Sequence, residues 1–202
     1  MTIYDLKPAF QNLLRPICKR LADAGYSANQ VTVAALLFSI IVGLLFALSP
    51  TKSWAALLIP VWLFLRMALN AIDGMLAREH NMQSDLGGIL NELGDVVSDT
   101  ALYLPFAVVP GIPAMLVVSV VLLSILTEMA GVVAVQIGAS RRYDGPMGKS
   151  DRAFVFGLLG LLLGIGLNPG WWSTAILAAV AVLAALTTLN RCARALAERN
   201  SA

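Results

Sequence analysis

The sequence predicts an all-α integral membrane protein, with six transmembrane helices preceded by an amphipathic helix at the membrane interface. Three observations predict this fold. First, 58% of the 202 residues are hydrophobic and the mean hydropathy is +0.79, whereas a soluble domain is about 45–50% apolar. Second, the apolar residues gather in six runs. Third, the cationic residues fall almost entirely on one side of those runs.

Each of the six runs is dominated by Leu, Val, Ala and Ile and predicts one membrane helix. The runs are residues 31–48, 54–69, 96–109, 112–139, 154–167 and 171–189. A membrane helix needs about 17–25 apolar residues, and the first and last runs supply these on their own. The second, third and fifth runs are shorter, so flanking residues must extend them or the helices must lie inside the bundle.

The positions of the cations predict the orientation of the chain. Twelve of the fourteen Lys and Arg residues lie before the first run or after the second, fourth and sixth runs, on one side of the membrane. Lys52 alone falls on the other side, and Arg66 lies within a run. Because short cytoplasmic loops are rich in Lys and Arg, we expect a multi-pass protein of the cytoplasmic (inner) membrane with both termini in the cytoplasm.

Residues 1–28 predict an amphipathic interfacial segment. Apolar residues recur every three or four positions, with cations between them, as is typical of a helix lying in the cytoplasmic interface. Pro8 and Pro16 are expected to kink or split this helix. Ser27 or Asn29 is expected to cap the first membrane helix.

Residues 29–202 are expected to form a single six-helix transmembrane domain with a cytoplasmic active site. Within it, Gly160 and Gly164 lie four residues apart in the fifth run. Small residues at this spacing let two helices approach closely. The pair indicates either close packing inside the bundle or the contact surface of a homodimer.

Polar residues concentrate where the second run ends and the third begins, and lipid disfavours such residues unless they have a function. At helical spacing, one face of the second helix carries Arg66, Asn70, Asp73 and Ala77, and one face of the third carries Asn91, Asp95 and Asp99, with Glu92 beside them. The two helices are antiparallel neighbours across a short loop. Their polar faces can therefore meet at the cytoplasmic mouth of the bundle.

Clustered carboxylates repel one another at low dielectric, so they need protons or cations to neutralise them. Oxygen ligands suit a hard cation such as Mg²⁺, Mn²⁺ or Ca²⁺ better than zinc, since the only imidazole, His80, lies in the connecting loop. Gly74 and Ala77 leave room beside Asp73 for a phosphorylated ligand. The guanidinium of Arg78 can donate two hydrogen bonds to the phosphate of that ligand. A divalent cation with an arginine is suited to phosphoryl chemistry.

Asp73-Gly74-x-x-Ala77-Arg78, followed after eight residues by Gly87, resembles the signature of the CDP-alcohol phosphatidyltransferases. The family signature is D-x-x-D-G-x-x-A-R and, after about eight residues, G-x-x-x-D-x-x-x-D. The match covers residues 70–95, and the predicted topology is also similar to the family. The resemblance implies that a phosphatidyl group moves from a CDP-linked lipid, such as CDP-diacylglycerol, to a small polar alcohol with release of CMP.

The resemblance also implies roles for individual residues. The residues that would hold Mg²⁺ or Mn²⁺ are Asn70, Asp73, Asn91 and Asp95, and those that would shape the CDP site are Gly74, Ala77, Arg78 and Gly87. Asp95 would also act as the general base on the acceptor hydroxyl.

Asn70 and Asn91 depart from the family pattern, which has Asp at both positions. Each removes one negative charge, so a two-metal site becomes a one-metal site or is lost, and Asp99 and Glu92 are candidates to compensate. A shifted interpretation takes Asp95 and Asp99 as the third and fourth Asp, which keeps Asp99 as a second candidate catalytic residue. It places Asn91 where the family has Gly and needs four more loop residues.

Two other kinds of function stay open. One is a catalytically impaired family member that binds CDP-lipid as a regulator or partner. The other is a small carrier that uses the acids as a cation site, which does not explain Gly74, Ala77 and Arg78. The charge pattern gives no reason to expect a nucleic acid partner, and membrane lipids are expected to surround the chain.

The loop at residues 141–152 lies on the same side as the acidic residues. Arg142, Lys149 and Arg152 are expected to bind a phosphate of the donor or of a phosphorylated acceptor. The alternative is a cationic loop that contacts anionic lipid headgroups. Glu128, within the fourth run, is expected to pair with Arg66 or to approach the metal site.

Overall fold

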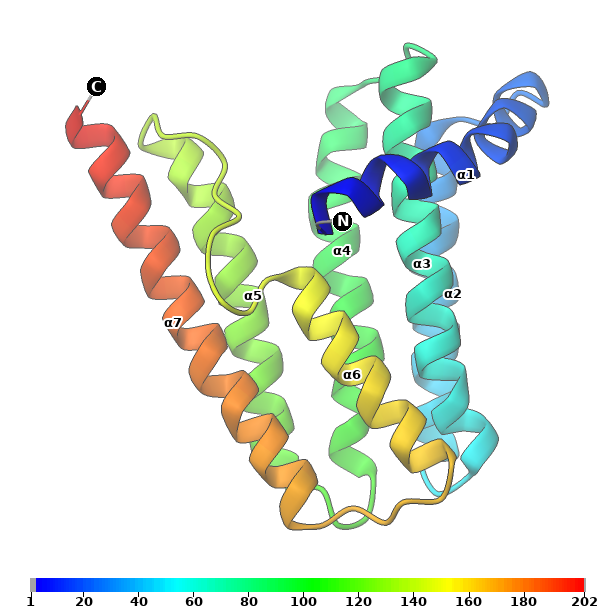
Figure 1. Ribbon diagram of the computed structural model, residues 1–202, viewed down its shortest axis with the longest axis vertical. Coiled ribbons are helices and arrows are strands. Elements are labelled where there is room, and N and C mark those ends of the chain that lie inside the picture. The colour runs from blue at the N-terminus through cyan, green and yellow to red at the C-terminus, as the bar shows by residue number, and fades with distance from the viewer. Residues whose placement is uncertain (1–2, 202) are drawn as a thin grey trace.

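The structure is a computed structural model that describes residues 3–201, with the side chains of residues 9–200. Over that range it is all-α, without a strand (Figure 1). The elements are α1 (Ile3–Asp23), α2 (Ala28–Leu48), α3 (Ser53–Glu79), α4 (Asp85–Tyr103), the short 3₁₀ helix η1 (Leu104–Val108), α5 (Ala114–Gln136), α6 (Lys149–Gly164) and α7 (Trp171–Ser201).

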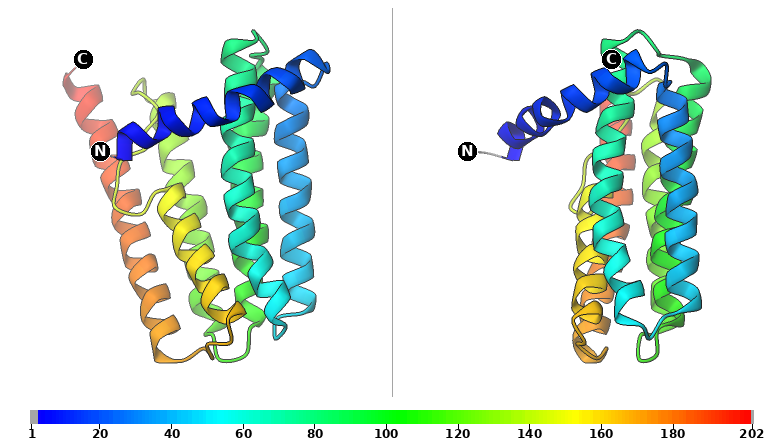
Figure 2. Two further views of the ribbon diagram at one scale, coloured as in Figure 1. Left: turned by 45° about the vertical axis from the view of Figure 1, so that its right-hand side comes forward. Right: turned by 90° about the vertical axis from the view of Figure 1, so that its right-hand side faces the viewer.

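Helices α2 to α7 form one bundle, and α1 lies across one end of it (Figures 1 and 2). Within the bundle α2 packs against both α3 and α4, α3 also packs against α6, and α5 packs against α7. The centre is apolar and aromatic. Phe106 of η1, for example, lies with its ring 4.9 Å from that of Phe46 and 5.2 Å from that of Phe156. Helices distant in sequence therefore share one core.

Four helices, α2, α3, α5 and α7, are long and apolar enough to cross a membrane. The other two bundle helices do not meet that description by themselves. Helix α4 has 19 residues but carries four carboxylates, and α6 has only 16 residues, about 24 Å at 1.5 Å per residue. The all-α membrane fold is confirmed, while six spanning helices remain a prediction.

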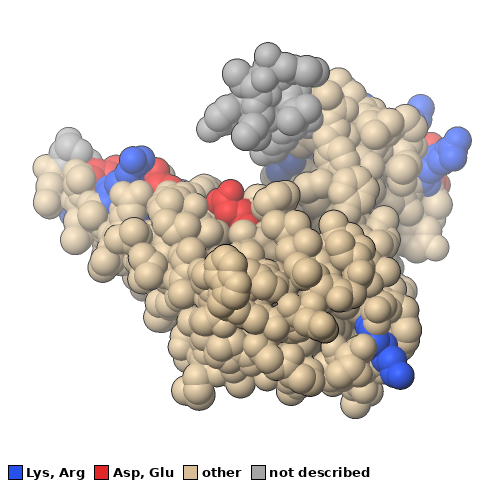
Figure 3. Space-filling view, turned by 60° about the horizontal axis from the view of Figure 1, so that its bottom comes forward, with Lys and Arg blue, Asp and Glu red and all other residues tan. Residues whose placement is uncertain are grey.

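Charge is distributed unequally between the two ends of the bundle. The loops that join α2 to α3, η1 to α5 and α6 to α7 lie at one end, and Figure 3 shows that surface almost free of charged side chains. The end of α3, the start of α4, helix α1 and the end of α7 lie toward the opposite end (Figure 1). The predicted separation of charge along the chain is therefore also a separation in space.

Helix α1 is continuous from Ile3 to Asp23, so Pro8 and Pro16 do not split it. Leu14 and Cys18 are buried against α2 and α3, and Arg15 holds both carboxylate oxygens of Glu79 on α3 at 3.2 and 3.0 Å. These contacts hold the helix across Pro16. The start of α2 is defined by Ser27, whose side chain forms a capping box with Gln30.

Glycines set the closest helix contacts. A Cβ on Gly160 would lie 3.0 Å from the carbonyl oxygen of Ala56, and one on Gly164 would lie 2.5 Å from the side chain of Leu57, both on α3. The pair thus serves close packing inside the bundle, the first of the two interpretations of its spacing. Gly43 of α2 is tighter still, because a Cβ there would lie 2.0 Å from the carbonyl oxygen of Ala101 on α4.

The segment between α5 and α6 runs down along the bundle before α6 begins (Figure 1). Two glycines let it lie close to its neighbours. A Cβ on Gly131 would lie 2.6 Å from the carbonyl oxygen of Arg142, and Gly145, with φ +125°, would place a Cβ 2.4 Å from the Thr187 side chain. The Thr187 hydroxyl accepts the N–H of Met147 at 2.9 Å. Helix α6 therefore starts part of the way down the bundle, where its first residue, Lys149, reaches Asp95 of α4.

Replacing Gly43 with Ala should lower the free energy of unfolding by about 1–3 kcal/mol, because overpacking forces α2 and α4 apart. The matched control is Gly88→Ala on α4, where a Cβ meets nothing within 4 Å and Ala favours the helix by about 1 kcal/mol. Thermal unfolding in detergent measures both changes. Equal stability of the two variants would contradict the close α2–α4 contact.

Candidate active site

The polar faces of α3 and α4 meet, as their spacing predicted. Arg66 of α3 is only 3% exposed, and its guanidinium lies between two carboxylates of α4. It donates to Asp99 at 2.5 Å and to the side chain of Asp95 at 3.1 Å, and it also reaches the Asp95 carbonyl oxygen at 3.1 Å. A buried arginine with two carboxylate partners satisfies its charge inside the bundle.

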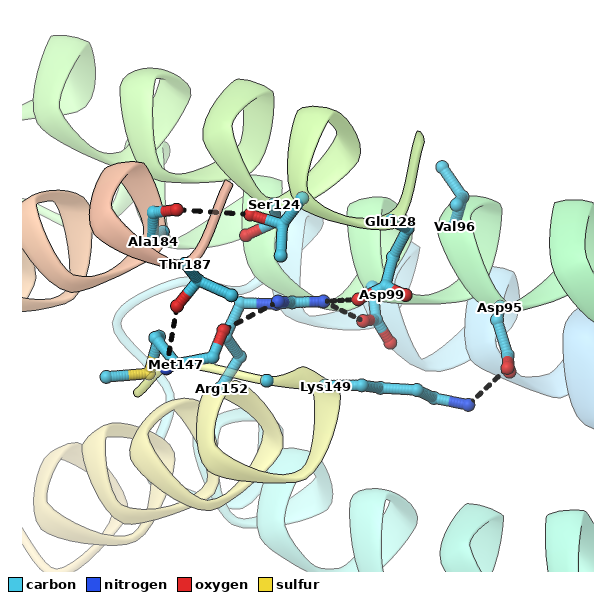
Figure 4. Close-up of polar contacts among 12 residues, drawn as sticks. Asp95, Val96, Asp99, Ser124, Glu128, Met147, Lys149, Arg152, Ala184 and Thr187 are labelled. Carbon is cyan, nitrogen blue, oxygen red and sulfur yellow. Dashed lines mark hydrogen bonds and ion pairs between the residues drawn. The ribbon is translucent and has the colours of Figure 1, made fainter. Parts of the chain in front are cut away.

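Asp95 is the point at which three elements converge. One carboxylate oxygen accepts from Arg66 and from the Asn70 amide, which lies 3.2 Å away. The other oxygen pairs with the ammonium of Lys149 at the start of α6, as Figure 4 shows. Residues 66, 70, 95 and 149, far apart in sequence, are therefore joined at one carboxylate.

Asp73 lies one turn beyond Asn70 and is 5% exposed. It accepts the hydroxyl of Thr32 on α2 at 2.8 Å. Within the described residues no cationic side chain forms an ion pair with Asp73, and no three His, Cys, Asp or Glu side chains form a group that could hold a metal ion. The predicted donor set is thus two carboxylates and the amides of Asn70 and Asn91. Carboxylate and amide oxygens are ligands that suit a hard divalent cation.

Asp99, the second candidate catalytic residue, lies one turn deeper in α4 and is 5% exposed. It is enclosed by Arg66 and by Arg152, whose nearest nitrogen is 3.8 Å away. It lines only a void of about 10 Å³, alongside Tyr103. Asp99 therefore faces the interior of the bundle, whereas Asp95 faces open space.

Glu128 of α5 does not pair with Arg66, so that expectation is wrong. It pairs instead with Arg152 at 2.7 Å, Arg141 at 3.3 Å and Arg191 at 3.4 Å. Arg66 is occupied by the acids of α4, and Glu128 faces α6, α7 and the loop between α5 and α6. Sequence analysis missed Arg141 and Arg191 here because both follow apolar runs and look like ordinary cytoplasmic cations.

The three predicted anion-binding cations lie in different surroundings. Arg152 is completely buried and donates to Glu128 and to the Met147 carbonyl oxygen. Arg142 holds Asp144 at 2.8 Å and Glu198 at 2.5 Å. Only Lys149 lies at Asp95. The three cations are therefore not gathered at one point.

Asp144 of the same loop is held by cations from two elements, Arg142 beside it and Arg194 of α7 at 2.7 Å. Burial raises the pKa of Asp144, but the hydrogen bonds and charge of Arg142 and the bond from Arg194 outweigh it, so this pKa lies below its ordinary value. The loop is thus tied to α7 by its own carboxylate.

Small residues lie where the ends of α2, α3 and α4 converge. A Cβ on Gly74 would lie 3.0 Å from the Arg78 guanidinium, so Arg78 lies over the backbone that Gly74 leaves open. A Cβ on Gly87 would lie 2.8 Å from the Asn29 side-chain oxygen. Ala77 is partly buried between α3 and its neighbours. The residues that the signature assigns to CDP thus surround one corner of the bundle.

Two hollows meet beside Asp95. The first, the apolar groove, has a volume of about 500 Å³ between α3 and α6; it is lined by Leu63, Phe64, Phe154, Leu158 and Leu161 and ends at Arg66, Asn70 and Lys149. The second, the polar cavity, has a volume of about 370 Å³ and is lined by Asn91, Glu92, Asp95, Glu128, Arg141, Lys149, Asp151 and Arg191. Lys149 and Ser150 line both hollows.

Known proteins related to this chain were found by both sequence and structure. The family model for CDP-alcohol phosphatidyltransferase matches residues 26–189. The inner membrane protein YnbA of Escherichia coli K12 is 49% identical over 194 residues, 95% of each chain. This relative is a membrane protein, and the present chain has four helices long and apolar enough to cross a membrane. The chain is therefore a multi-pass membrane protein.

Two solved structures share the fold. Both are of the phosphatidylinositol phosphate synthase PgsA1 of Mycobacterium tuberculosis, one with CDP-DAG bound and one with manganese and citrate. Each aligns with a TM-score of 0.75, at 18% and 19% identity. The alignments cover 89% and 90% of this chain and 92% and 88% of the other.

Replacing Glu128 with Gln should lower the free energy of unfolding by about 3–5 kcal/mol, because three arginines lose their shared carboxylate in a buried setting. Glu79→Gln is the matched control, since it removes an equally well-placed partner of Arg15 at an exposed position and should leave stability nearly unchanged. Thermal unfolding in detergent compares the two. Similar changes in both variants would contradict a structural role for the buried cluster.

Proposed function

This chain belongs to the CDP-alcohol phosphatidyltransferase family, and we propose that it transfers a phosphatidyl group from CDP-diacylglycerol to a small polar alcohol, releasing CMP. One observation carries the proposal. Asp95 lines the polar cavity, and its ion-pair partner Lys149 lines both that cavity and the apolar groove. An amphipathic donor and a polar acceptor could reach the same carboxylate from opposite sides.

The apolar groove supports a lipid donor. Its walls come from α3 and α6, and Phe64 and Phe154 are exposed there at 59% and 71%. Its polar end lies at Arg66, Asn70 and Lys149. A lipid with its acyl chains in the groove would therefore have its diphosphate near Arg66 and Lys149 and toward Gly74 and Arg78. PgsA1, which shares the fold, has been solved with CDP-DAG bound.

Asp95 is proposed to act as the general base, since it faces the polar cavity while Asp99 is enclosed by arginines. It would take the proton of the acceptor hydroxyl. The hydroxyl oxygen would then form a bond to the lipid-bearing β-phosphorus, and the bond from that phosphorus to the CMP oxygen would break. Lys149 and Arg66 hold Asp95 in place for this step.

The proposed divalent cation would be held by Asp73 with the side-chain oxygens of Asn70 and Asn91, and by Asp95. When bound, Mg²⁺ or Mn²⁺ would supply neutralisation of the diphosphate charge. Arg78 would bind a phosphate of CDP from the edge of the same corner. The manganese-bound structure of PgsA1 supports a divalent ion in this fold.

The proposed topology follows from the same assignment. The charged end, which carries Asp73 and Asp95, would face the cytoplasm of an inner-membrane protein, where CDP-lipid and CMP are handled. Helices α4 and α6 would complete six spans. Leu13 and Ile17 of α1 are 72% and 48% exposed and would insert into the interface as an amphipathic anchor.

The direct test is CMP release by purified protein with CDP-diacylglycerol, Mg²⁺ or Mn²⁺ and a set of alcohols. We expect release to require metal and one class of alcohol, and Asp95→Asn to lower turnover by about 10²–10⁴-fold while the protein stays folded. Asp85→Asn, an exposed acid of the same helix, should leave turnover unchanged.

The outcomes separate the alternatives. Retained turnover in Asp95→Asn, lost instead in Asp99→Asn, would move the base to Asp99. Binding of CDP-lipid without CMP release from any alcohol would indicate a catalytically impaired member that acts as a regulator or partner.

Arg78→Ala should raise the Kd for CDP-diacylglycerol by about ten- to a hundredfold, because a charge-assisted hydrogen bond to phosphate is lost. The control is Arg194→Ala, an exposed arginine at the same end that pairs with Asp144. A binding titration without acceptor separates this effect from turnover. Equal affinities of the two variants would refute the proposed role of Arg78.

A further inference from the structure

The cations of the polar cavity are already neutralised by carboxylates of the chain itself. Four carboxylates line the cavity, those of Glu92, Asp95, Glu128 and Asp151, beside three cations, Arg141, Lys149 and Arg191. Each of the three cations forms an ion pair with at least one of these acids. The formal charge of the lining is therefore not positive.

Arg141 has little capacity left for another anion. Its Nε and Nη2 atoms hold the two oxygens of Glu92 at 3.0 and 2.8 Å, and Nη2 also lies 3.3 Å from Glu128. Its Nη1 atom donates to the carbonyl oxygen of Arg142 at 2.7 Å. A guanidinium has five N–H donors in a fixed planar arrangement. In Arg141 each of the three nitrogens donates to an oxygen of the protein.

Arg191 is committed in the same way. Its Nη1 atom donates to the Thr127 carbonyl oxygen at 2.6 Å and lies 3.4 Å from Glu128, and its Nε atom donates to the Asp144 carbonyl oxygen at 3.2 Å. It is 1% exposed. A phosphate that bound these two nitrogens of Arg191 would have to displace the backbone carbonyl oxygens or Glu128.

A phosphorylated alcohol brings about −1.5 to −2 charge at neutral pH, and each cation of the lining already pairs with a carboxylate. The charge of the proposed divalent cation would be neutralised by the donor diphosphate. A hydroxylated molecule without phosphate is not repelled by these carboxylates and can form hydrogen bonds with them. Glu92, Asp151 and the Asn91 amide offer oxygens that accept hydroxyl protons, and the Tyr143 ring, stacked under Arg141 at 4.6 Å, offers an apolar wall.

On this basis, and resting on the proposed transfer reaction, we infer that the acceptor alcohol carries no phosphate group. Carboxylates of the chain occupy the cations that an acceptor phosphate would need, and Glu92 is the most accessible of them, with a side chain 37% exposed. Glu92 is therefore a specificity-determining residue of the polar cavity. Lys149, which pairs with Asp95, lies at the junction with the apolar groove, where the donor diphosphate would lie.

Matched pairs of acceptors test the inference: glycerol with glycerol 3-phosphate, and myo-inositol with its phosphate. CMP release by the wild type should favour the unphosphorylated member by about tenfold or more in kcat/KM, since like charges at a binding site disfavour the phosphorylated one. Glu92→Gln, which frees Arg141, should narrow that preference. Glu79→Gln, which frees Arg15 outside the cavity, should leave it unchanged.

Preference of the wild type for a phosphorylated member would overturn the inference while leaving the transferase function standing. Absence of CMP release with every acceptor would instead be a failure of the proposed function. A second measurement then decides the inference alone, namely the shift in thermal unfolding caused by inorganic phosphate at constant ionic strength. Stabilisation of Glu92→Gln but not of the wild type would support it. Equal responses of the two proteins, whether both shift or neither does, would overturn it.

Discussion

The ion pairs of Arg66 are the interaction on which the rest of the site depends. A guanidinium buried in an apolar bundle has a large desolvation cost. It is stable there because Asp95 and Asp99 both accept its hydrogen bonds and balance its charge. The three residues join the middle of α3 to the second half of α4 and fix which acid faces outward. Asp99 is turned inward to Arg66 and Arg152, and Asp95 lines the polar cavity beside Lys149, which also lines the apolar groove.

A second cluster of the same kind supports the other half of the molecule. Glu128 gathers arginines from α6, α7 and the loop between α5 and α6. Glycines at positions 131 and 145 let that loop lie against α5 and α7, so that α6 begins at the depth of Asp95. Because α6 begins there, its first residues, Lys149 and Ser150, line both the apolar groove and the polar cavity. Charge pairing and close backbone contact together thus create the space in which a reaction can occur.

The replacement of two acids by amides is consistent with this network. Asn70 donates to Asp95, which an aspartate at that position could do only if protonated. With two fewer negative charges, Arg66 and Lys149 suffice to balance Asp95. Asn70 is thus part of the network of hydrogen bonds and ion pairs around Asp95.

The sequence alone determined the class of fold, the end of the bundle that carries the site, and the faces of α3 and α4 that meet, because hydrophobic runs and helical spacing are local properties. It could not assign partners to the cations. Arg66 and Glu128 both looked like intramembrane charges in need of a partner. They belong to different clusters, because the arrangement of the helices in the bundle decides which side chains are adjacent. The same holds for the basic loop, whose arginines read as anion ligands until the tertiary structure showed their carboxylate partners. Ion pairing depends on distances between helices, and only the packed bundle sets those distances.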